Sequence, residues 1–488
     1  METKLTTNLT MLTDFYELTM ANGYLRRGFG EREVCFDMFF RTVPDHGGYA
    51  IMAGVEQLAE YLKNLRFDED DLDYLRARGC FCEEFLDYLR NFRFACDVWA
   101  IPEGTPIFPG EPIVTVRGPV IQAQFIETMV LLLINHQSLI ATKAKRITRA
   151  ARGSAVMEFG SRRAQGGDGA ILGARAAFIG GCGATACTIA DREYGIPAVG
   201  TMAHSWVMMF DSEYEAFRAY AEEYPDNCTL LIDTYSVMHS GLPNAIRVFN
   251  EVLLPKGYRP KGIRIDSGDL AYLSRQVRTK LDEAGFPDCG IVVSNALDEF
   301  LIKDLMQQGA PINSFGVGER LITSSSAPVF GGVYKLAAVE KDGVLEPKMK
   351  ISENVGKITT PAFKTVWRLF DNQTGKAIAD VITLFDEEIE SGKPYMLFDP
   401  EHIWKRKSVS DFTAVRLPVQ LFRRGECCYS SPDVREIQRY CTQQCDTLWD
   451  EVLRLENPHR YYVDLSQKLW DIKEALIMRS HRVEEENL

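Results

Sequence analysis

A short acidic turn is the first feature of the sequence that could carry out chemistry. Asp266 and Asp269 stand three residues apart around Ser267 and Gly268, directly after the apolar run 262–265. Carboxylate oxygens are ligands that Mg²⁺ prefers, usually with water between them, and a metal-bound diphosphate would need donors of this kind. Ser267 or Asp269 could instead cap a helix that begins at residue 270. Both interpretations can hold, with different residues in each role.

Arginines and glycines at the ends of expected strands suit the binding of an anion. Arg162, Arg163 and Arg264 could each hold an anion through two parallel hydrogen bonds, although surface ion pairs are the usual fate of a lone arginine. Gly316 and Gly318 could let backbone N–H groups approach a phosphate closely. A glycine pair is a weak signal on its own, because many turns contain one.

The seven histidines do not indicate a metal site, because the sequence contains no HxxxH or HxH pair. His204 stands out among them, since it follows an expected strand within the small residues GTMAHS. A neutral imidazole can act as a nucleophile or a proton carrier at pH 7. A structural role for His204 is the alternative, and His239 is its nearest competitor for a functional one.

The elements that must position these residues alternate along residues 150–350. Short apolar runs and helical patterns follow one another, which predicts parallel strands with right-handed crossovers. Polar and small residues follow nearly every run. In a barrel such strand ends form one ring around one pocket, whereas an open sheet uses only its switch point, so six polar strand ends favour an α/β barrel. The expected strands are 155–159, 198–200, 229–232, 262–265, 290–293 and 312–315, and the expected helices are 170–179, 212–223, 242–254, 270–285 and 298–308.

The flanking regions differ from this central one. Residues 70–94 have a helical pattern, 95–122 a β-rich pattern broken by Pro and Gly, and 124–149 the pattern of a long apolar helix with a basic end. The last part of the chain has a helical pattern at its end. We therefore expect three domains, over 1–150, 151–350 and 351–488, the last packing back on the other two.

Composition and charge limit the class of protein. Hydrophobic residues make up 46% and charged residues 25% of 488 residues, as in a globular protein, and the longest apolar run, 129–134, is too short to cross a bilayer. The N-terminus lacks the pattern of a secretion signal, so we expect a cytoplasmic location. The net charge of −13 argues against nucleic-acid binding. The twelve cysteines are expected to be free thiols, since they form no pair of CxxC motifs.

The sequence carries nine motifs in an order that spans nearly the whole chain. They are TDFYELTM (13–20), FFRTVP with GGYAIMAG (39–54), EFGSRRAQG (158–166), GIPAVGTMAHSWVM (195–208), YPDNCTLLIDTYSV (224–237), IRIDSGDL (263–270), SFGVGERLITS (314–324), GGVYKL (331–336) and ENPHRYYVDLSQKLWDIK (456–473). Together they resemble the nicotinate phosphoribosyltransferase family. The resemblance implies an irregular α/β barrel of the type II phosphoribosyltransferases, an N-terminal α/β-sandwich domain, a helical C-terminal extension and a homodimer with shared active sites.

The resemblance also implies residues for the pyridine ring and for the chemistry. Tyr16, contributed by the partner subunit, and Phe159 would stack on the two faces of nicotinate. Thr201 and Arg264 would hold nicotinate or its neighbouring phosphates. The implied catalytic residues are His204, which the family phosphorylates from ATP, together with Arg264, Asp266 and Asp269.

A second implied set would hold the phosphates of phosphoribosyl pyrophosphate. Arg162 would bind a phosphate or a carboxylate, and Thr323 would contact the phosphoribosyl pyrophosphate. Mg²⁺ would bind through the diphosphate, and no residue is assigned as its direct ligand. Glu319 departs from the small polar residue that the family often has, and an acid beside a phosphate is unfavourable unless it points away or meets a metal. The residues that would cradle the 5-phosphate are Ser294, Asn295, Gly316 and Gly318.

The implied reaction converts nicotinate, phosphoribosyl pyrophosphate, ATP and water to nicotinate mononucleotide, pyrophosphate, ADP and phosphate, the first step of NAD synthesis from nicotinate. Mg²⁺ and ATP are the implied cofactor and co-substrate. Two alternatives stay open, a nicotinamide phosphoribosyltransferase and a non-catalytic paralogue that binds NAD metabolites. The acid is favoured by the resemblance around GTMAHS, because its carboxylate needs Arg or backbone N–H donors.

Overall fold

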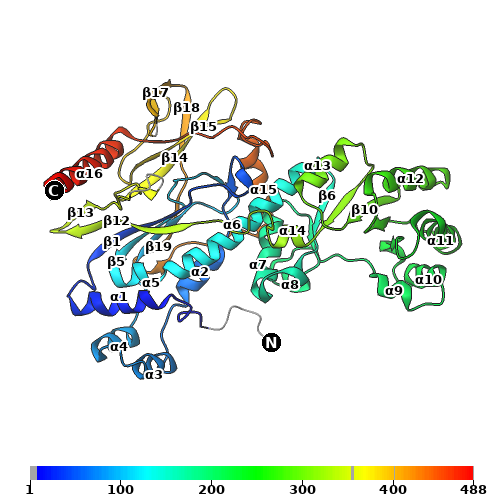
Figure 1. The fold of residues 1–488 in the computed structure, drawn as a ribbon, viewed down its shortest axis with the longest axis horizontal. Coiled ribbons are helices and arrows are strands. Elements are labelled where there is room, and N and C mark those ends of the chain that lie inside the picture. The colour runs from blue at the N-terminus through cyan, green and yellow to red at the C-terminus, as the bar shows by residue number, and fades with distance from the viewer. Residues whose placement is uncertain (1–7, 353–356, 401, 487–488) are drawn as a thin grey trace. The chain divides into compact units, whose positions relative to one another are not determined.

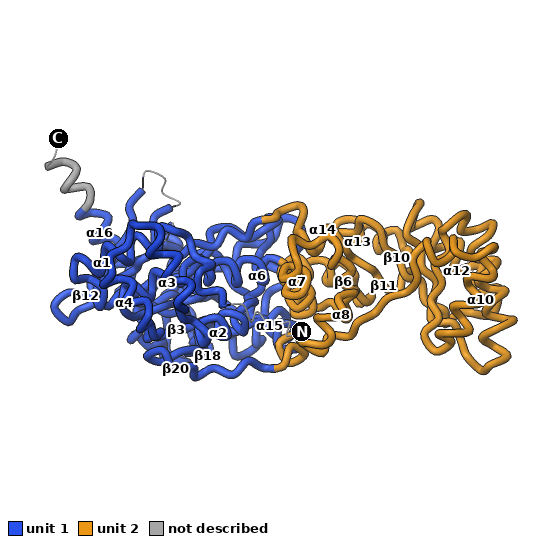
Figure 2. The backbone as a smooth tube through the Cα atoms, turned by 90° about the horizontal axis from the view of Figure 1, so that it is seen from below, with its two compact units in different colours: residues 1–139, 329–432, 439–488 blue, residues 140–328, 433–438 orange. Residues whose placement is uncertain are grey.

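A computed structural model of the chain describes residues 8–352, 357–400 and 402–486. The chain divides into two compact units, shown in different colours in Figure 2. Unit 1 comprises residues 1–139, 329–432 and 439–488, and unit 2 comprises residues 140–328 and 433–438. The chain returns to unit 1 after residue 328, so unit 1 joins most of the first and third segments expected from the sequence.

Unit 2 is built on a six-stranded sheet in which all recorded pairings are parallel. The expectation of parallel strands is confirmed, and short apolar runs that are largely buried account for them. Within the described part of unit 2 no pairing joins the two edge strands, so the pairing alone does not show a closed barrel, which stays a prediction. In sheet order the strands are β7 (Ala184–Thr185), β6 (Ala155–Glu158), β11 (Ser314–Val317), β10 (Gly290–Ser294), β9 (Gly262–Ile265) and β8 (Thr229–Leu231).

The expected strand at 198–200 was wrong. This segment makes only an isolated bridge, between Thr185 and Ala198. Two hydrogen bonds flank the bridge, from Thr185 N–H to the Pro197 carbonyl (3.0 Å) and from Val199 N–H to the Thr185 carbonyl (2.9 Å). Pro197 has no N–H to donate, which limits the ladder on its side.

Helices connect the strands of unit 2 and begin close to the carboxyl ends of several of them (Figure 1). Two of these starts are capped by aspartates: Asp269 accepts the N–H of Tyr272 (2.9 Å), and Asp298 accepts those of Phe300 (3.1 Å) and Leu301 (2.8 Å). Because parallel strands bring their carboxyl ends to one edge, the residues between strand and helix share that edge. The helices are α7 (Gly166–Ile179), α8 (Thr188–Tyr194), α9 (His204–Met208), α10 (Glu213–Glu223), α11 (Leu242–Val248), α12 (Leu270–Glu283), α13 (Glu299–Gln307) and α14 (Glu319–Ile322).

Unit 1 contains a seven-stranded antiparallel sheet and a smaller four-stranded sheet. The larger sheet has the order β13 (Val344–Pro347), β12 (Val333–Lys341), β1 (Glu33–Phe39), β5 (Val114–Pro119), β3 (Asp97–Ala100), β19 (Val419–Arg423) and β20 (Glu426–Cys427). The smaller one has the order β18 (Phe412–Arg416), β14 (Lys364–Asp371), β15 (Ala377–Leu384) and β21 (Val463–Leu465). Two further pairs are β2 (Ala50–Ile51) with β4 (Pro106–Ile107), and β16 (Tyr395–Asp399) with β17 (His402–Val409).

The helices of unit 1 only partly follow the sequence patterns. The pattern at 70–94 forms two helices rather than one, separated by a turn at which Gly79 has a left-handed φ of 68°. Helices α15 (Val434–Asp446) and α16 (Gln467–Glu486) give the expected helical end, but strands occupy much of the C-terminal segment before them. The other helices are α1 (Phe15–Arg26), α2 (Val55–Lys63), α3 (Glu69–Ala77), α4 (Glu83–Arg90) and α5 (Val120–Phe125).

The long apolar pattern at 124–149 forms helix α6 (Glu127–Ala150). Together with α5 it gives a 31-residue helical stretch, Val120–Ala150, that is long and apolar enough to cross a membrane by length and composition. Its most apolar window is 67% buried inside the protein. A core helix of a globular protein has the same properties, so this stretch does not by itself indicate a membrane segment.

Candidate active site

Arg264 is the centre of a hydrogen-bond network at the carboxyl edge of the parallel sheet. It lies near the end of β9, and its side chain is only 16% exposed. Its Nε donates to Ser294 Oγ on β10 (2.9 Å), its Nη1 to Thr201 Oγ1 (3.3 Å) and its Nη2 to Asp266 Oδ1 (3.2 Å). Ser294 Oγ also donates to Asp266 Oδ1. Four of the residues singled out from the sequence therefore meet in one cluster.

Asp233, two residues after β8, holds the acidic turn in place and was not among the expected site residues. Its Oδ2 accepts the Asp266 N–H (2.9 Å) and the Ser267 hydroxyl (2.6 Å). Its Oδ1 is buried and has no hydrogen-bond partner within the described protein. A buried carboxylate oxygen without a donor is costly, so Asp233 is suited to face a cationic or hydrogen-bonding group. Its place one residue after an apolar run was the available signal.

His204 begins helix α9 and faces the same cluster. Its Nδ1 lies 3.1 Å from Thr234 Oγ1, and its Nε2 lies 3.9 Å from Asp266 Oδ2. If Nδ1 carries the proton and donates it to Thr234, Nε2 keeps a free lone pair; this tautomer is inferred from the contact. The imidazole is 39% exposed, so a second substrate can reach it. Thr234 was not expected from the sequence as its partner.

Phe159 lies directly after β6, beside Gly316 of the neighbouring strand β11 and Gly318, which follows that strand. Its N–H donates to the Val317 carbonyl (2.7 Å), and the Arg264 Cζ lies 5.9 Å from the centre of its ring. The half-buried Phe159 ring is therefore close to the Arg264 guanidinium. This position suits a residue that stacks on an aromatic ligand whose carboxylate binds Arg264.

Buried Glu158 fixes the backbone that leaves β6. Its carboxylate accepts the Gly160 N–H and the Thr185 hydroxyl, the latter at 2.6 Å. Burial raises the pKa of Glu158 above its ordinary value of 4.5. These bonds hold the start of the loop that carries Arg162, whose side chain is exposed.

Glu319 does not point at the proposed phosphate loop. Its carboxylate lies 3.6 Å from Arg163 Nε, and both side chains are more than half exposed. The negative charge of Glu319, which departs from the family pattern, is thus balanced by Arg163 in a solvent-screened ion pair. Thr323 ends helix α14, and its hydroxyl donates to the Glu319 carbonyl (2.7 Å).

Asn295 and Asp269 lie at strand ends, but their recorded features are structural. Asn295 has a left-handed φ of 95°, which is unusual for a residue other than glycine and marks a tight turn after β10. Asp269 uses Oδ1 to cap helix α12, so the cap that the sequence left between Ser267 and Asp269 belongs to Asp269. The substrate-binding role assigned to Asn295 and the catalytic role assigned to Asp269 stay predictions.

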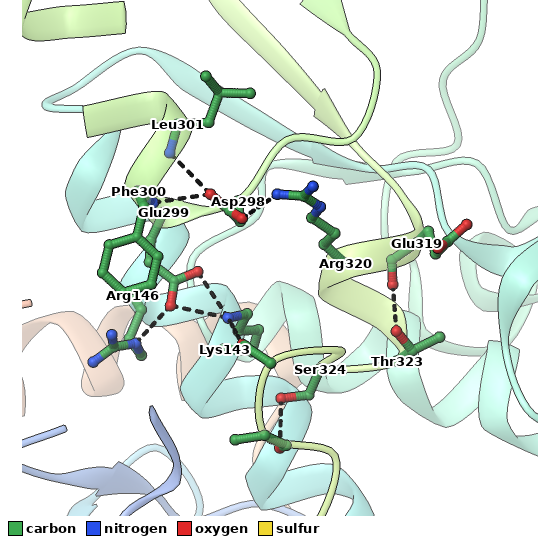
Figure 3. A network of polar contacts seen from close by, with 12 residues as sticks. Lys143, Arg146, Asp298, Glu299, Phe300, Leu301, Glu319, Arg320, Thr323 and Ser324 are labelled. Carbon is green, nitrogen blue, oxygen red and sulfur yellow. Dashed lines mark hydrogen bonds and ion pairs between the residues drawn. The ribbon is translucent and has the colours of Figure 1, made fainter. Parts of the chain in front are cut away.

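A network of polar contacts anchors the N-terminus of helix α13 (Figure 3). Glu299 is fully buried and pairs with Lys143 Nζ (2.8 Å) and Arg146 Nε (2.9 Å). Next to it, Asp298 accepts a hydrogen bond from the Arg320 guanidinium and also caps helix α13. Glu299, Lys143 and Arg146 form a buried set, and removing one member would leave an uncompensated charge, so this set holds the start of α13 against α6. Arg320 is 42% exposed, so its pair with Asp298 is a weaker contact.

Tyr16 belongs to unit 1, whereas the cluster described above belongs to unit 2. Tyr16 lies in the first turn of α1 and is 44% exposed. Burial and the nearby Glu127 carboxylate raise the pKa of its phenol above the ordinary value, so the ring stays neutral at physiological pH. The exposed position leaves the ring available to another molecule.

The described residues contain no group of three or more His, Cys, Asp or Glu side chains arranged to hold a metal ion. Hollows of about 560 Å³ beside α4 and of about 220 Å³ beside β16, β17 and β21 lie within unit 1. Neither is lined by residues of the Arg264 cluster. The case for an active site thus depends on the strand-end side chains.

Comparison with known proteins identifies the family. Residues 11–135 match the model of the nicotinate phosphoribosyltransferase N-terminal domain, residues 154–377 that of the nicotinate phosphoribosyltransferase family, and residues 363–473 that of its C-terminal domain. The nicotinate phosphoribosyltransferase of Bacillus subtilis is 43% identical over 482 residues, covering 98% of this chain and 97% of the relative. That of Caenorhabditis elegans is 33% identical over 531 residues, covering 96% and 93%.

The fold agrees with these sequence matches. The crystal structure of human nicotinic acid phosphoribosyltransferase superposes with a TM-score of 0.85 at 29% identity, covering 95% of this chain and 99% of the human one. The motifs that carry the resemblance include the residues of the Arg264 cluster. The chain therefore belongs to the nicotinate phosphoribosyltransferase family.

Proposed function

We propose that this chain joins the ring nitrogen of nicotinate to C1′ of phosphoribosyl pyrophosphate, releases pyrophosphate and couples this transfer to ATP hydrolysis. The observation that carries the proposal is the cluster in which Arg264 links Thr201, Asp266 and Ser294, in a chain of this family. A cation flanked by hydroxyls and a carboxylate suits a reaction between two anionic substrates.

The nicotinate carboxylate binds to the free donors of Arg264. A guanidinium has five N–H groups, and three of them already bind Ser294, Thr201 and Asp266, which leaves two for the carboxylate. The Phe159 ring stacks on one face of the pyridine, and Tyr16 of the partner subunit covers the other. Nicotinamide carries no charge, so this site rejects it because the guanidinium donors would be left without an anion.

The phosphoribosyl pyrophosphate binds along the ends of β9, β10 and β11. Ser294, Asn295, Gly316 and Gly318 hold its 5-phosphate, and Arg162 and Thr323 contact its other oxygens. As the C1′–O bond to pyrophosphate breaks, the C1′ centre becomes cation-like and the pyridine nitrogen donates its lone pair to it. The protein's main task is to hold both reactants in line and to balance charge.

The acidic turn fits a Mg²⁺ ion carried by the diphosphate. Asp233 Oδ1 is buried without a hydrogen-bond partner among the described residues, and the recorded contact of Asp266 Oδ2 is with His204 Nε2 at 3.9 Å, so both carboxylates offer oxygens to such an ion. Mg²⁺ is usually bound by one or two carboxylates plus water and substrate phosphates. A bound Mg²⁺ would neutralise charge on the departing pyrophosphate.

His204 takes the γ-phosphoryl group of ATP before the transfer. Its Nε2 forms a bond to the γ-phosphorus, the bond from that phosphorus to the bridging oxygen breaks, and ADP leaves with the electron pair. Water later cleaves the phosphohistidine and releases phosphate. Thr234 holds the Nδ1 proton during the attack, and the phosphoryl oxygens beside Asp266 reorganise the diphosphate contacts.

The direct test of this function is product formation from phosphoribosyl pyrophosphate with nicotinate or nicotinamide, each with and without Mg-ATP. We expect product from nicotinate but not from nicotinamide, and faster formation of nicotinate mononucleotide when Mg-ATP is present. A faster reaction with nicotinamide would show that the chain is a nicotinamide phosphoribosyltransferase instead. No product from either substrate would leave a protein that only binds NAD metabolites, and cytoplasmic fractionation would test its proposed location.

The role of His204 makes the first prediction. His204→Ala loses the stimulation by ATP but keeps slow ATP-independent transfer, because the stacking and phosphate contacts remain. Wild-type protein incubated with γ-labelled ATP acquires an acid-labile label, and the variant does not. His239→Ala is the matched control, since this exposed histidine makes no recorded contact with the cluster. Full ATP stimulation in His204→Ala would refute the phosphohistidine step.

A further inference from the structure

Gly316 lies against the ring of Phe159 across two paired strands. In the pairing of β11 with β6, Gly316 is opposite Met157 and Val317 is opposite Glu158, so Phe159 follows directly. A Cβ atom added at Gly316 would lie 2.6 Å from Phe159 Cδ2 and 2.8 Å from Cε2. Carbon atoms in contact are about 3.5–4.0 Å apart, so the ring occupies the space that a side chain would need.

The backbone does not require glycine at this position. Gly316 lies inside a strand and is not among the glycines with positive φ, in contrast to Gly268 in the acidic turn, whose φ is 81°. An alanine can therefore adopt the conformation of Gly316. The next nearest atom to the added Cβ is Ser294 Cβ at 3.5 Å, an ordinary contact. The Phe159 ring thus fills the space beside Gly316 that a side chain at this position would need.

We propose that Gly316 is a positioning residue for the pyridine half of the site, because it seats the Phe159 ring. The inference rests on the proposed function, in which Phe159 stacks on nicotinate. It gives Gly316 a task beyond the 5-phosphate role implied by the family resemblance. Gly316 acts through Phe159 and needs no contact of its own with nicotinate.

The ring cannot avoid a new side chain by moving its backbone. Phe159 N–H is bound to the Val317 carbonyl at 2.7 Å, and the next residue, Gly160, is bound to buried Glu158. The ring must therefore turn about its own side-chain bonds. Such a turn changes its distance from Arg264, now 5.9 Å from the ring centre to Cζ. Displacement of a reactant by about 1 Å can cost about 100-fold in rate.

Gly318 provides the matched comparison on the same strand end. A Cβ added there would meet backbone atoms of Phe159, with the carbonyl oxygen nearest at 3.1 Å, and no ring atom is among its three nearest neighbours. A side chain at Gly318 therefore presses on the main chain of Phe159 and Gly160 and shifts the strand end proposed to hold the 5-phosphate, whereas one at Gly316 meets the ring itself. The two substitutions should affect different substrates.

The experiment measures KM for each substrate in wild type, Gly316→Ala, Gly318→Ala, Phe159→Ala and the double variant Gly316→Ala/Phe159→Ala. Gly316→Ala is expected to raise the KM for nicotinate about tenfold or more. It should change the KM for phosphoribosyl pyrophosphate less than about twofold, because alanine keeps the backbone N–H with which Gly316 would hold the 5-phosphate. Gly318→Ala is expected to raise mainly the KM for phosphoribosyl pyrophosphate. In the Phe159→Ala background, Gly316→Ala should add almost nothing, because the ring that it displaces is gone.

Two outcomes would overturn the proposal. One is a higher KM for phosphoribosyl pyrophosphate alone in Gly316→Ala, and the other is an equal effect of this substitution with and without the Phe159 ring. If Gly316→Ala does not fold, the double variant Gly316→Ala/Phe159→Ala should have the same Tm as Phe159→Ala. A lower Tm in the double variant would contradict the proposal that Gly316 leaves space for the Phe159 ring. If the wild type forms no product from nicotinate, the proposed function fails. The Tm values of the wild type, the two single variants and the double variant still show whether Gly316 positions the Phe159 ring.

Discussion

At the residue scale, Arg264 matters because it holds three different groups at once. Only a guanidinium can donate in three fixed directions and keep two further N–H groups for a carboxylate. A lysine keeps the positive charge but has a single nitrogen on a flexible stem. The geometry of Arg264, more than its charge, should therefore determine activity.

Arg264→Lys is expected to lower kcat/KM for nicotinate by about 100-fold or more, the scale of losing a preorganised electrostatic contact. Circular dichroism and Tm should change little. Arg275→Lys is the control, because Arg275 is an exposed residue of α12 whose guanidinium donates to the Gln308 carbonyl and makes no recorded contact with the Arg264 cluster among the described residues. Steady-state kinetics with each substrate varied in turn measures the effect. Retention of activity within about threefold in Arg264→Lys would show that charge alone suffices.

Residue types alone pointed to some members of this cluster and not to others. Arg264 could be singled out as a cation near the end of an apolar run, and Asp266 and His204 because each follows such a run among small residues. Asp233 and Thr234 follow such a run too, but their role depends on which strands are neighbours, and β8 lies beside β9 only in the folded sheet. Pairing across the sheet is a tertiary property that local sequence does not contain.

At the element scale, the start of helix α13 shows which of two effects should dominate. Asp298 caps the helix with one carboxylate oxygen and takes the Arg320 guanidinium with the other, and Arg320 is 42% exposed. An ion pair with that exposure contributes less than about 1 kcal/mol, whereas a lost cap costs about 1 kcal/mol and up to 2. The cap should therefore outweigh the ion pair.

Three substitutions separate these contributions. Asp298→Asn keeps a capping oxygen and Arg320→Gln removes only the cation, so each should lower Tm by about 2 °C or less. Asp298→Ala loses both interactions and should lower Tm by several degrees, roughly 3–8 °C. It should also raise the KM for phosphoribosyl pyrophosphate, because α13 follows the loop that carries Ser294 and Asn295. Equal shifts in Asp298→Asn and Asp298→Ala would mean that the ion pair is the dominant contact.

Strand and helix patterns predicted the central elements well where burial is strong. The runs at 262–265 and 290–293 became β9 and β10 almost unchanged, because they are apolar and sit inside the sheet. The two-residue strand β7 was missed, since so short a run has no periodicity to detect. The strands of the C-terminal segment were also missed, and their pairing with distant residues, such as β15 with β21, explains why.

At the scale of the whole molecule, the proposed function needs residues from both compact units. Tyr16 lies in unit 1 and the Arg264 cluster in unit 2. Helix α1 and the residues before it also expose large apolar side chains, including Leu12 (45%), Phe15 (43%) and Met20 (36%). A group of exposed apolar residues is typical of a protein interface. We therefore propose a homodimer in which Tyr16 of each subunit completes the site of the other.

Shared sites predict complementation between two defective variants. When Tyr16→Ala and Arg264→Ala are co-expressed, about half of the dimers are mixed, and each mixed dimer has one site with both residues intact. About a quarter of wild-type activity should then return, measured at nicotinate concentrations far below KM, where each variant alone is slow. His204→Ala with Arg264→Ala is the control pair: both residues belong to unit 2, so every mixed site keeps one defect and no activity returns. If the Tyr16 and Arg264 variants also fail to complement, although mixed dimers are purified with two different tags, Tyr16 acts within its own chain or not at all, because only a site assembled from two subunits can regain both residues.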